Sequence, residues 1–140
     1  MTIIATAQAS STAPAAAFFA KWADMATWPE WNNDTEWVRL DGPFVQGATG
    51  TLKPKGGPKV PFVVERLNDT EFVDVSALIG ARLAFDHQIT EADGRTTISV
   101  TVSIDGPLRW LWTKVMGGDL ATSVRTDLDA LIAAAEGVRA

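Results

Sequence analysis

The spacing of hydrophobic residues changes at Gly106 and Pro107, and this change constrains the fold more than any other feature of the sequence. Before it, apolar residues alternate with small polar ones over 97–104, the pattern of a strand with one buried face. After it, the apolar spacing is helical almost to the end of the chain. The sequence therefore predicts an antiparallel strand that leads directly into a long C-terminal helix.

That helical region carries two apolar stripes that lie roughly 160° apart: Leu108, Leu111, Trp112 and Val115 form the first, and Val124, Leu128, Leu131 and Ala135 form the second. Gly117 and Gly118 lie between them, and each glycine costs about 1 kcal/mol in a helix interior relative to alanine. Asp119 follows as a suitable N-cap. We therefore expect a kink or break at the glycines, with the second half as the main core helix.

The rest of the chain reads as a strand, short helices and a meander of strands. Residues 2–9 favour a strand, Pro14 suits a helix start, and Pro29 ends the helical pattern, with a short helix or turn around it. Between 36 and 105, turn signals recur every 8 to 14 residues or so, which is typical of antiparallel strands joined by tight turns. The sequence thus predicts an α+β fold.

Composition narrows the functions that such a fold can serve. The 140 residues, 46% of them hydrophobic, suit a single domain spanning 1–140. The net charge of −5, without a dense Lys/Arg cluster, argues against nucleic acid as a partner. One histidine and no cysteine make a metal site unexpected, and no cofactor motif is present. No apolar run is long enough for stable membrane insertion, and the lack of cysteine suits a cytoplasmic protein.

The order of these elements resembles the START-like (SRPBCC) superfamily, in particular its bacterial polyketide cyclase/dehydrase and lipid-transport group. The resemblance spans nearly the whole chain and rests on the order and spacing of short motifs: Asp24, Trp28 and Trp31 after the first helix, Gly42 and Gly47 in the first hairpin, Gly94, Arg95 and Thr96 before the last strand, and Gly106, Pro107 and Leu108 at the helix entrance.

The resemblance implies a helix-grip fold, in which a curved antiparallel sheet of about six to seven strands wraps around the long C-terminal helix. It also implies two short helices after the first strand and an internal cavity for a hydrophobic ligand. Binding, with transport as an extension, is the leading hypothesis for function. The alternative is an enzyme of the polyketide cyclase or dehydratase type, and the superfamily fold alone does not select between them.

Few polar residues are candidates for chemistry. His87 alternates with Leu83, Phe85 and Ile89, which places it on the apolar face of its strand, where it would carry a proton or anchor a ligand carbonyl. A partly buried histidine that bonds only to a neighbour explains the same pattern. Alternation leaves open which face of the 70–79 strand, with Asp74, lines the cavity. Arg82 and Asp86 share the face opposite His87, which favours a solvated or cross-strand pair.

We expect the ligand to contact mainly aromatic and branched side chains: Trp22, Trp28, Trp31, Phe62, Phe85, His87, Val100 and Val102. The tryptophans among them fit a plain core equally well. Trp110 lies on the other side of its helix from the first stripe, so one apolar surface there should face solvent, a lid or a second subunit, and a homodimer is one such arrangement. A third hypothesis, a protein-interaction module with exposed tryptophans, would show no connected cavity.

Overall fold

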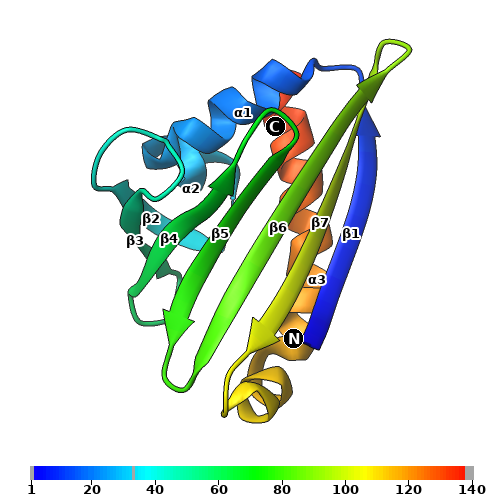
Figure 1. Cartoon of the computed structure of the whole chain (residues 1–140). Coiled ribbons are helices and arrows are strands. Elements are labelled where there is room, and N and C mark those ends of the chain that lie inside the picture. Colours follow the sequence, from blue (N-terminus) through cyan, green and yellow to red (C-terminus); the bar gives the residue numbers. More distant parts are fainter. Residues whose placement is uncertain (1, 33, 138–140) are drawn as a thin grey trace.

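The computed structural model describes residues 2–32 and 34–137, and these form one sheet with helices on its concave side (Figure 1). The elements follow in the order β1 (Thr2–Ser11), α1 (Ala15–Ala23), the 3-10 turn η1 (Met25–Thr27), α2 (Trp28–Trp31), β2 (Thr35–Leu40), β3 (Thr49–Pro54), β4 (Val60–Leu67), β5 (Glu71–Leu78), β6 (Ala81–Ala92), β7 (Arg95–Asp105) and α3 (Arg109–Ala135).

The sheet has seven antiparallel strands in the order β1-β7-β6-β5-β4-β3-β2. The first and last strands of the chain, β1 and β7, are neighbours in the sheet, and α3 crosses behind the strands (Figure 1). Register shifts in β1, β2 and β4 mark irregularities of the bulge type, which bend strands and increase their twist. The structure confirms the predicted helix-grip α+β fold, with the short helices after the first strand.

Helix α3 is continuous over Arg109–Ala135, so the predicted break at the two glycines is wrong. A Cβ at Gly117 would meet only Thr113 at 3.6 Å, and one at Gly118 would meet nothing, so neither glycine marks a place where another segment enters the helix. The change of direction that we expected is visible in Figure 1, where the yellow first turns are seen almost along their axis and the orange turns from the side. Tertiary contacts on both sides of the glycines offset their helix cost.

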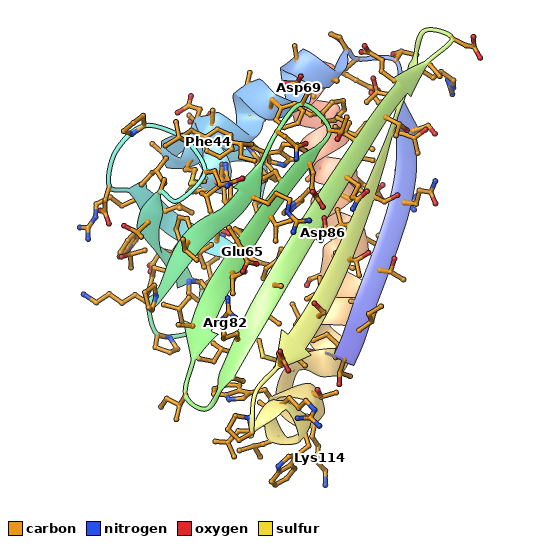
Figure 2. The ribbon with its side chains drawn as sticks, viewed as in Figure 1. Phe44, Glu65, Asp69, Arg82, Asp86 and Lys114 are labelled. Carbon is orange, nitrogen blue, oxygen red and sulfur yellow. The ribbon has the colours of Figure 1, made fainter. Side chains whose placement is uncertain are left out.

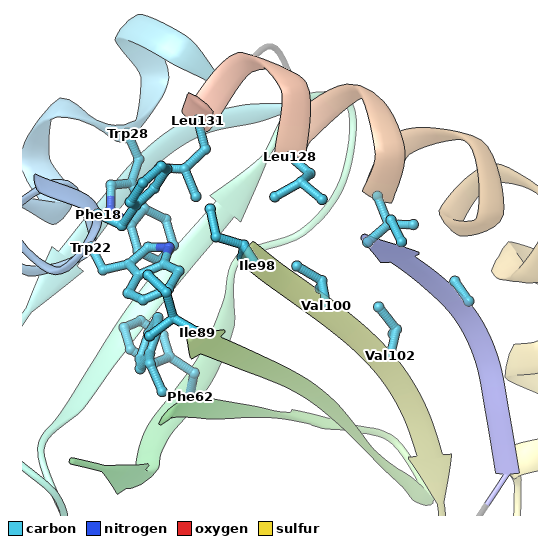
Figure 3. Packing of buried hydrophobic residues seen from close by; sticks show 14 of the residues in the cluster. Phe18, Trp22, Trp28, Phe62, Ile89, Ile98, Val100, Val102, Leu128 and Leu131 are labelled. Carbon is cyan, nitrogen blue, oxygen red and sulfur yellow. The ribbon is translucent and has the colours of Figure 1, made fainter. Parts of the chain in front are cut away.

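The solid part of the core lies where α3 covers β1 and β7. Ile98, Val102 and Ile104 of β7 are fully buried there, and Leu128 and Leu131 of α3 face them (Figure 3). Helix α1 adds Phe18 and Trp22, which are also buried. The second half of α3 therefore supplies the core face, as its apolar stripe predicts.

The first turn of α3 forms an apolar tip with the β5–β6 turn. Trp110 is 64% exposed and Ile79 is 81% exposed, whereas the Trp112 indole donates a hydrogen bond of 2.8 Å to the Ile79 carbonyl. One apolar surface here thus faces outward, as expected, while the homodimer stays a prediction. No helix in the described ranges 2–32 and 34–137 is long and apolar enough to cross a membrane.

Gly106 fixes the entry into α3, and we predict that Gly106→Ala destabilises the protein by at least about 2 kcal/mol. Its φ is +117°, and a Cβ would lie 2.6 Å from the Gly80 carbonyl oxygen and 2.8 Å from the Ala81 Cα. Both neighbours are backbone atoms, which cannot swing aside. Urea unfolding measures the change, and Gly42→Ala, where a Cβ would meet nothing within 4 Å, is the matched control. Equal stability of the two variants would contradict this account.

Candidate functional site

A cavity of about 620 Å³ lies between the concave face of the sheet and the helices α2 and α3. It exists because α3 packs mainly on β1, with lesser contact to β7 and β6, and does not extend over the concave face of β3, β4 and β5. Apolar side chains make most of its wall, from α2, β3, β4, β6, β7 and α3: Trp28, Trp31, Leu52, Val60, Leu83, Phe85, Val100, Trp112, Met116, Leu120, Val124, Leu128 and Leu131.

Strand β5 turns Asp74 and Ser76 toward this cavity, which settles the face that alternation left open. Asp74 is paired with Phe85 across the β5–β6 ladder, and Phe72 is paired with His87, so these residues share one face of the sheet. Asp74 and Ser76 are 8% and 6% exposed as residues. Two polar side chains are therefore buried in a wall that is otherwise largely apolar.

His87 lies at the junction of this wall with the aromatic core. Its ring stacks on Phe72 with centroids 4.9 Å apart and contacts Trp22 at 5.2 Å. Its Nδ1 lies 2.9 Å from the Phe72 carbonyl oxygen, and because a carbonyl only accepts, Nδ1 carries the hydrogen. In the neutral ring Nε2 then holds a lone pair. His87 lines the cavity, so this lone pair can serve a ligand as an acceptor or a base.

Burial keeps both polar groups neutral over a wide pH range. It lowers the pKa of His87 from 6.5 to about 4, and the hydrogen bonds to the Phe72 and Phe85 backbone offset only part of this effect. Burial likewise raises the pKa of Asp74 from 3.8 to about 7. The Asp74 Oδ1 lies 3.8 Å from the His87 Nδ1, beyond a good hydrogen bond. Between about pH 4 and pH 7 the two groups are a carboxylic acid beside a neutral imidazole, not an ion pair.

Two further carboxyl groups, Asp34 and Asp127, line the same cavity from the segment before β2 and from α3. Burial raises the pKa of Asp127 to about 7, and the negative charge of Asp34 and a hydrogen bond with its side chain add to the shift. Sequence reasoning missed Asp127. Asp127 lies three residues after Val124 and four before Leu131, two members of the second apolar stripe. This spacing was the available signal, because it places an acid on an apolar face.

The structure places six of the eight predicted ligand contacts in the cavity wall, namely Trp22, Trp28, Trp31, Phe85, His87 and Val100. Phe62 and Val102 lie outside the wall, in the packed core at 6% and 0% exposure. Alternation over 97–104 gave Val102 a buried face, but residue spacing had no means to show that protein side chains cover Val102 and Phe62. The Trp28 indole donates to the Lys21 carbonyl at 3.1 Å, whereas the buried Trp31 Nε1 has no partner.

Arg82 and Asp86 lie on the outward face of the sheet, as their alternation with His87 indicates (Figure 2). They do not pair with each other: the Arg82 guanidinium lies 3.3 Å from Glu65. Burial, followed by the charge of Glu71, raises the pKa of Asp86. Across the part of the chain that the structure describes, no group of three or more His, Cys, Asp or Glu side chains is arranged to hold a metal ion.

Several solved structures share this fold at low sequence identity. The Zhui aromatase/cyclase from Streptomyces sp. R1128 is 14% identical, with a TM-score of 0.73 over 94% of this chain and 92% of that one. A START superfamily protein from Mycobacterium smegmatis is 13% identical, with a TM-score of 0.69 over 94% and 96%. The hypothetical protein jhp0584 from Helicobacter pylori is 14% identical, with a TM-score of 0.75 over 94% and 86%. These likenesses show the fold.

No curated protein matches the chain in sequence. The family described as polyketide cyclase / dehydrase and lipid transport matches over residues 2–136, nearly the whole chain. This match agrees with the seven-stranded sheet, the long last helix and the START-like neighbours. The chain therefore belongs to the polyketide cyclase / dehydrase and lipid-transport family.

Proposed function

We propose that this protein binds a hydrophobic or aromatic small molecule in the cavity between α3 and the sheet. The observation that carries the proposal is the cavity itself, whose volume of about 620 Å³ falls within the range of roughly 300–1,000 Å³ typical of small-molecule sites. An empty apolar space of this size is costly to maintain, because the side chains around it lose dispersion contacts. A guest molecule restores those contacts.

Apolar burial is sufficient to hold such a guest. At about 25 cal/mol per Å², a ligand that buries about 300 Å² of apolar surface gains about 7 kcal/mol before the costs of association. The wall offers tryptophan, leucine and valine side chains for this contact, among them Trp28, Trp31 and Trp112. The description of the family includes lipid transport, which supports a carrier role for a ligand held in this way.

We predict that the neutral fluorophore N-phenyl-1-naphthylamine binds at a ratio of one to one, with a Kd on the order of micromolar. Val100→Trp should weaken binding at least tenfold, because Val100 lines the cavity and a larger side chain there fills the space. The control is Thr101→Trp, one residue along on the outward face, where Thr101 pairs with Asp86. Fluorescence titration measures both, with thermal unfolding to check the fold.

Unchanged binding in Val100→Trp, or no binding by the parent protein, would exclude the cavity as the site for this probe. Native mass spectrometry after incubation with a cell lipid extract extends the test to natural ligands. The third hypothesis, a protein-interaction module, expected no connected cavity, so the cavity favours the binding hypothesis over it.

A second candidate function is catalysis of a cyclase or dehydratase type, which the position of His87 beside Asp74 favours. Dehydration of a β-hydroxyketone removes an α-hydrogen as a proton and expels hydroxide, which leaves an enone and water. The His87 Nε2 lone pair is suited to take the proton, and a protonated Asp74 is suited to give one to the leaving hydroxyl. The aromatase/cyclase activity in the name of one structural neighbour is consistent with such a role.

If this candidate is right, 4-hydroxy-4-phenyl-2-butanone will be converted to the enone with a rate maximum between about pH 4 and pH 7. Those limits are the pKa values of His87 and Asp74, because activity needs a neutral imidazole and a protonated acid. His87→Ala should abolish turnover, while Asp86→Asn on the outward face should not. Absorbance of the enone follows the reaction, and turnover that survives in His87→Ala eliminates this mechanism.

The protonation states can be tested without any ligand, through stability. A folded Asp74 keeps its proton up to about pH 7 whereas an unfolded one loses it near 3.8, so its contribution is present at low pH and lost as the pH rises through this window. Asp74→Asn should therefore gain stability relative to the parent from pH 4 to pH 7, by up to about 1.4 kcal/mol per pH unit.

His87→Phe should show the opposite trend in the same experiment. The folded His87 stays neutral down to about pH 4 whereas the unfolded one gains a proton below 6.5, so its contribution rises with pH between these values. The variant should thus gain on the parent as the pH falls. Urea unfolding at three pH values measures both differences, and parallel trends in the two variants would disprove the assigned protonation states.

A further inference from the structure

We propose that Asp74, Ser76 and His87 form a polar strip that selects a neutral ligand bearing a hydroxyl group and disfavours a carboxylate. The inference rests on the proposed binding function and specifies the chemistry of its ligand. The strip runs across two neighbouring strands: Asp74 and Ser76 come from the cavity face of β5, and His87 comes from β6, two residues beyond Phe85, the partner of Asp74.

The strip has unused hydrogen-bonding capacity. The Asp74 carboxyl accepts a hydrogen bond from its own backbone N–H, and it lies 3.8 Å from the His87 Nδ1, which is too far for a good hydrogen bond. The His87 ring uses Nδ1 on the Phe72 carbonyl. Within residues 2–32 and 34–137, the fully buried side-chain atoms without a hydrogen-bond partner are Trp31 Nε1 and Asp86 Oδ1. Neither belongs to the strip, so a strip atom without a partner is still accessible from the cavity. Buried polar groups normally find partners, and here a ligand is in the position to supply them.

A hydroxyl matches the donors and acceptors of the strip. The lone pair of His87 Nε2 accepts a hydrogen bond from the ligand O–H, while Ser76 and a protonated Asp74 donate to the ligand oxygen. An ether or a bare hydrocarbon leaves the imidazole lone pair without a donor. A buried polar group of the site stays unpaired when the ligand lacks a matching hydrogen-bonding group, and this weakens binding. The strip therefore makes the hydroxyl a requirement for tight binding.

The cavity offers an anionic ligand acidic neighbours and, among the described residues, no buried cation. Asp34 and Asp127 line it together with Asp74, whereas Lys59 is the one cationic side chain in the wall and is exposed. No arginine of the described chain lines this wall. A carboxylate placed at the strip would lie beside Asp74 without a buried cation to offset its charge, and an unpaired buried charge is costly. A fatty acid or an aromatic carboxylate is therefore the wrong class of ligand.

Four probes with the same ring system test this inference: naphthalene, 2-naphthol, 2-methoxynaphthalene and 2-naphthoate. Titrations at about pH 6 keep Asp74 protonated and His87 neutral, as their pKa values of about 7 and about 4 require. We expect 2-naphthol to bind about tenfold more tightly than naphthalene or the methyl ether, and naphthoate to bind most weakly. Equal affinities of naphthol and naphthalene, or tighter binding of naphthoate, would overturn the inference.

Failure of all four probes to bind would instead overturn the proposed binding function, so the two failures are distinguishable. Asp74→Leu should remove the preference for naphthol and keep naphthalene binding, whereas Asp74→Asn, whose amide both donates and accepts, should retain it. Asp86→Leu, on the outward face of β6, is the control for the loss of an acid. A preference that survives in Asp74→Leu would remove Asp74 from the strip.

The histidine gives a readout that does not depend on affinity. The chain has one histidine, so selective labelling with ¹⁵N gives one pair of imidazole signals. We expect 2-naphthol to shift the Nε2 signal through a new hydrogen bond, and 2-methoxynaphthalene to leave it nearly unchanged. An Nε2 signal that does not respond to bound naphthol would exclude His87 from hydroxyl recognition.

Discussion

The docking of α3 on one side of the sheet is the constraint on which the rest of the structure depends. Leu128 and Leu131 of α3 pack against the buried residues of β7, and this burial holds the helix in place. The curved sheet extends beyond that contact through β5, β4 and β3. Since one helix is too narrow to cover seven twisted strands, a cavity of about 620 Å³ remains over the strands that α3 does not cover.

The two halves of the concave face therefore differ in their role: one half packs into the core, and the other lines the cavity. On β7, Val102 and Ile104 are sealed by protein atoms, whereas Val100 of the same alternating set also reaches the cavity. On β5, the same face carries Asp74 and Ser76, which line the cavity. Burial of an acid and an imidazole costs stability at neutral pH or low pH respectively. Under the proposed function, a ligand that bonds to these two groups would offset that cost.

Much of the fold was predictable from local patterns. Alternation over 97–104 fixed the last strand and its buried face, and the turn signals gave the meander, because short-range periodicity records which side of an element is buried. Of the kink or break predicted at the glycine pair, only the break is wrong, since the cost of two glycines is small beside the packing of a 27-residue helix. For the site, alternation identified His87 but had no means to rank Asp74, whose strand is apolar on both faces.

The sequence by itself determined the α+β class, the order of the elements and the inward face of His87, because these follow from residue spacing and turn chemistry over a few positions. Only the tertiary structure decided which apolar residues line a cavity and which fill the core, as Val100 and Val102 show. It also decided that Asp74 lies 3.8 Å from His87 and that Asp34 lies beside Asp127. Such proximities, and the pKa values that burial shifts, arise from strand pairing and helix docking between residues distant in the chain.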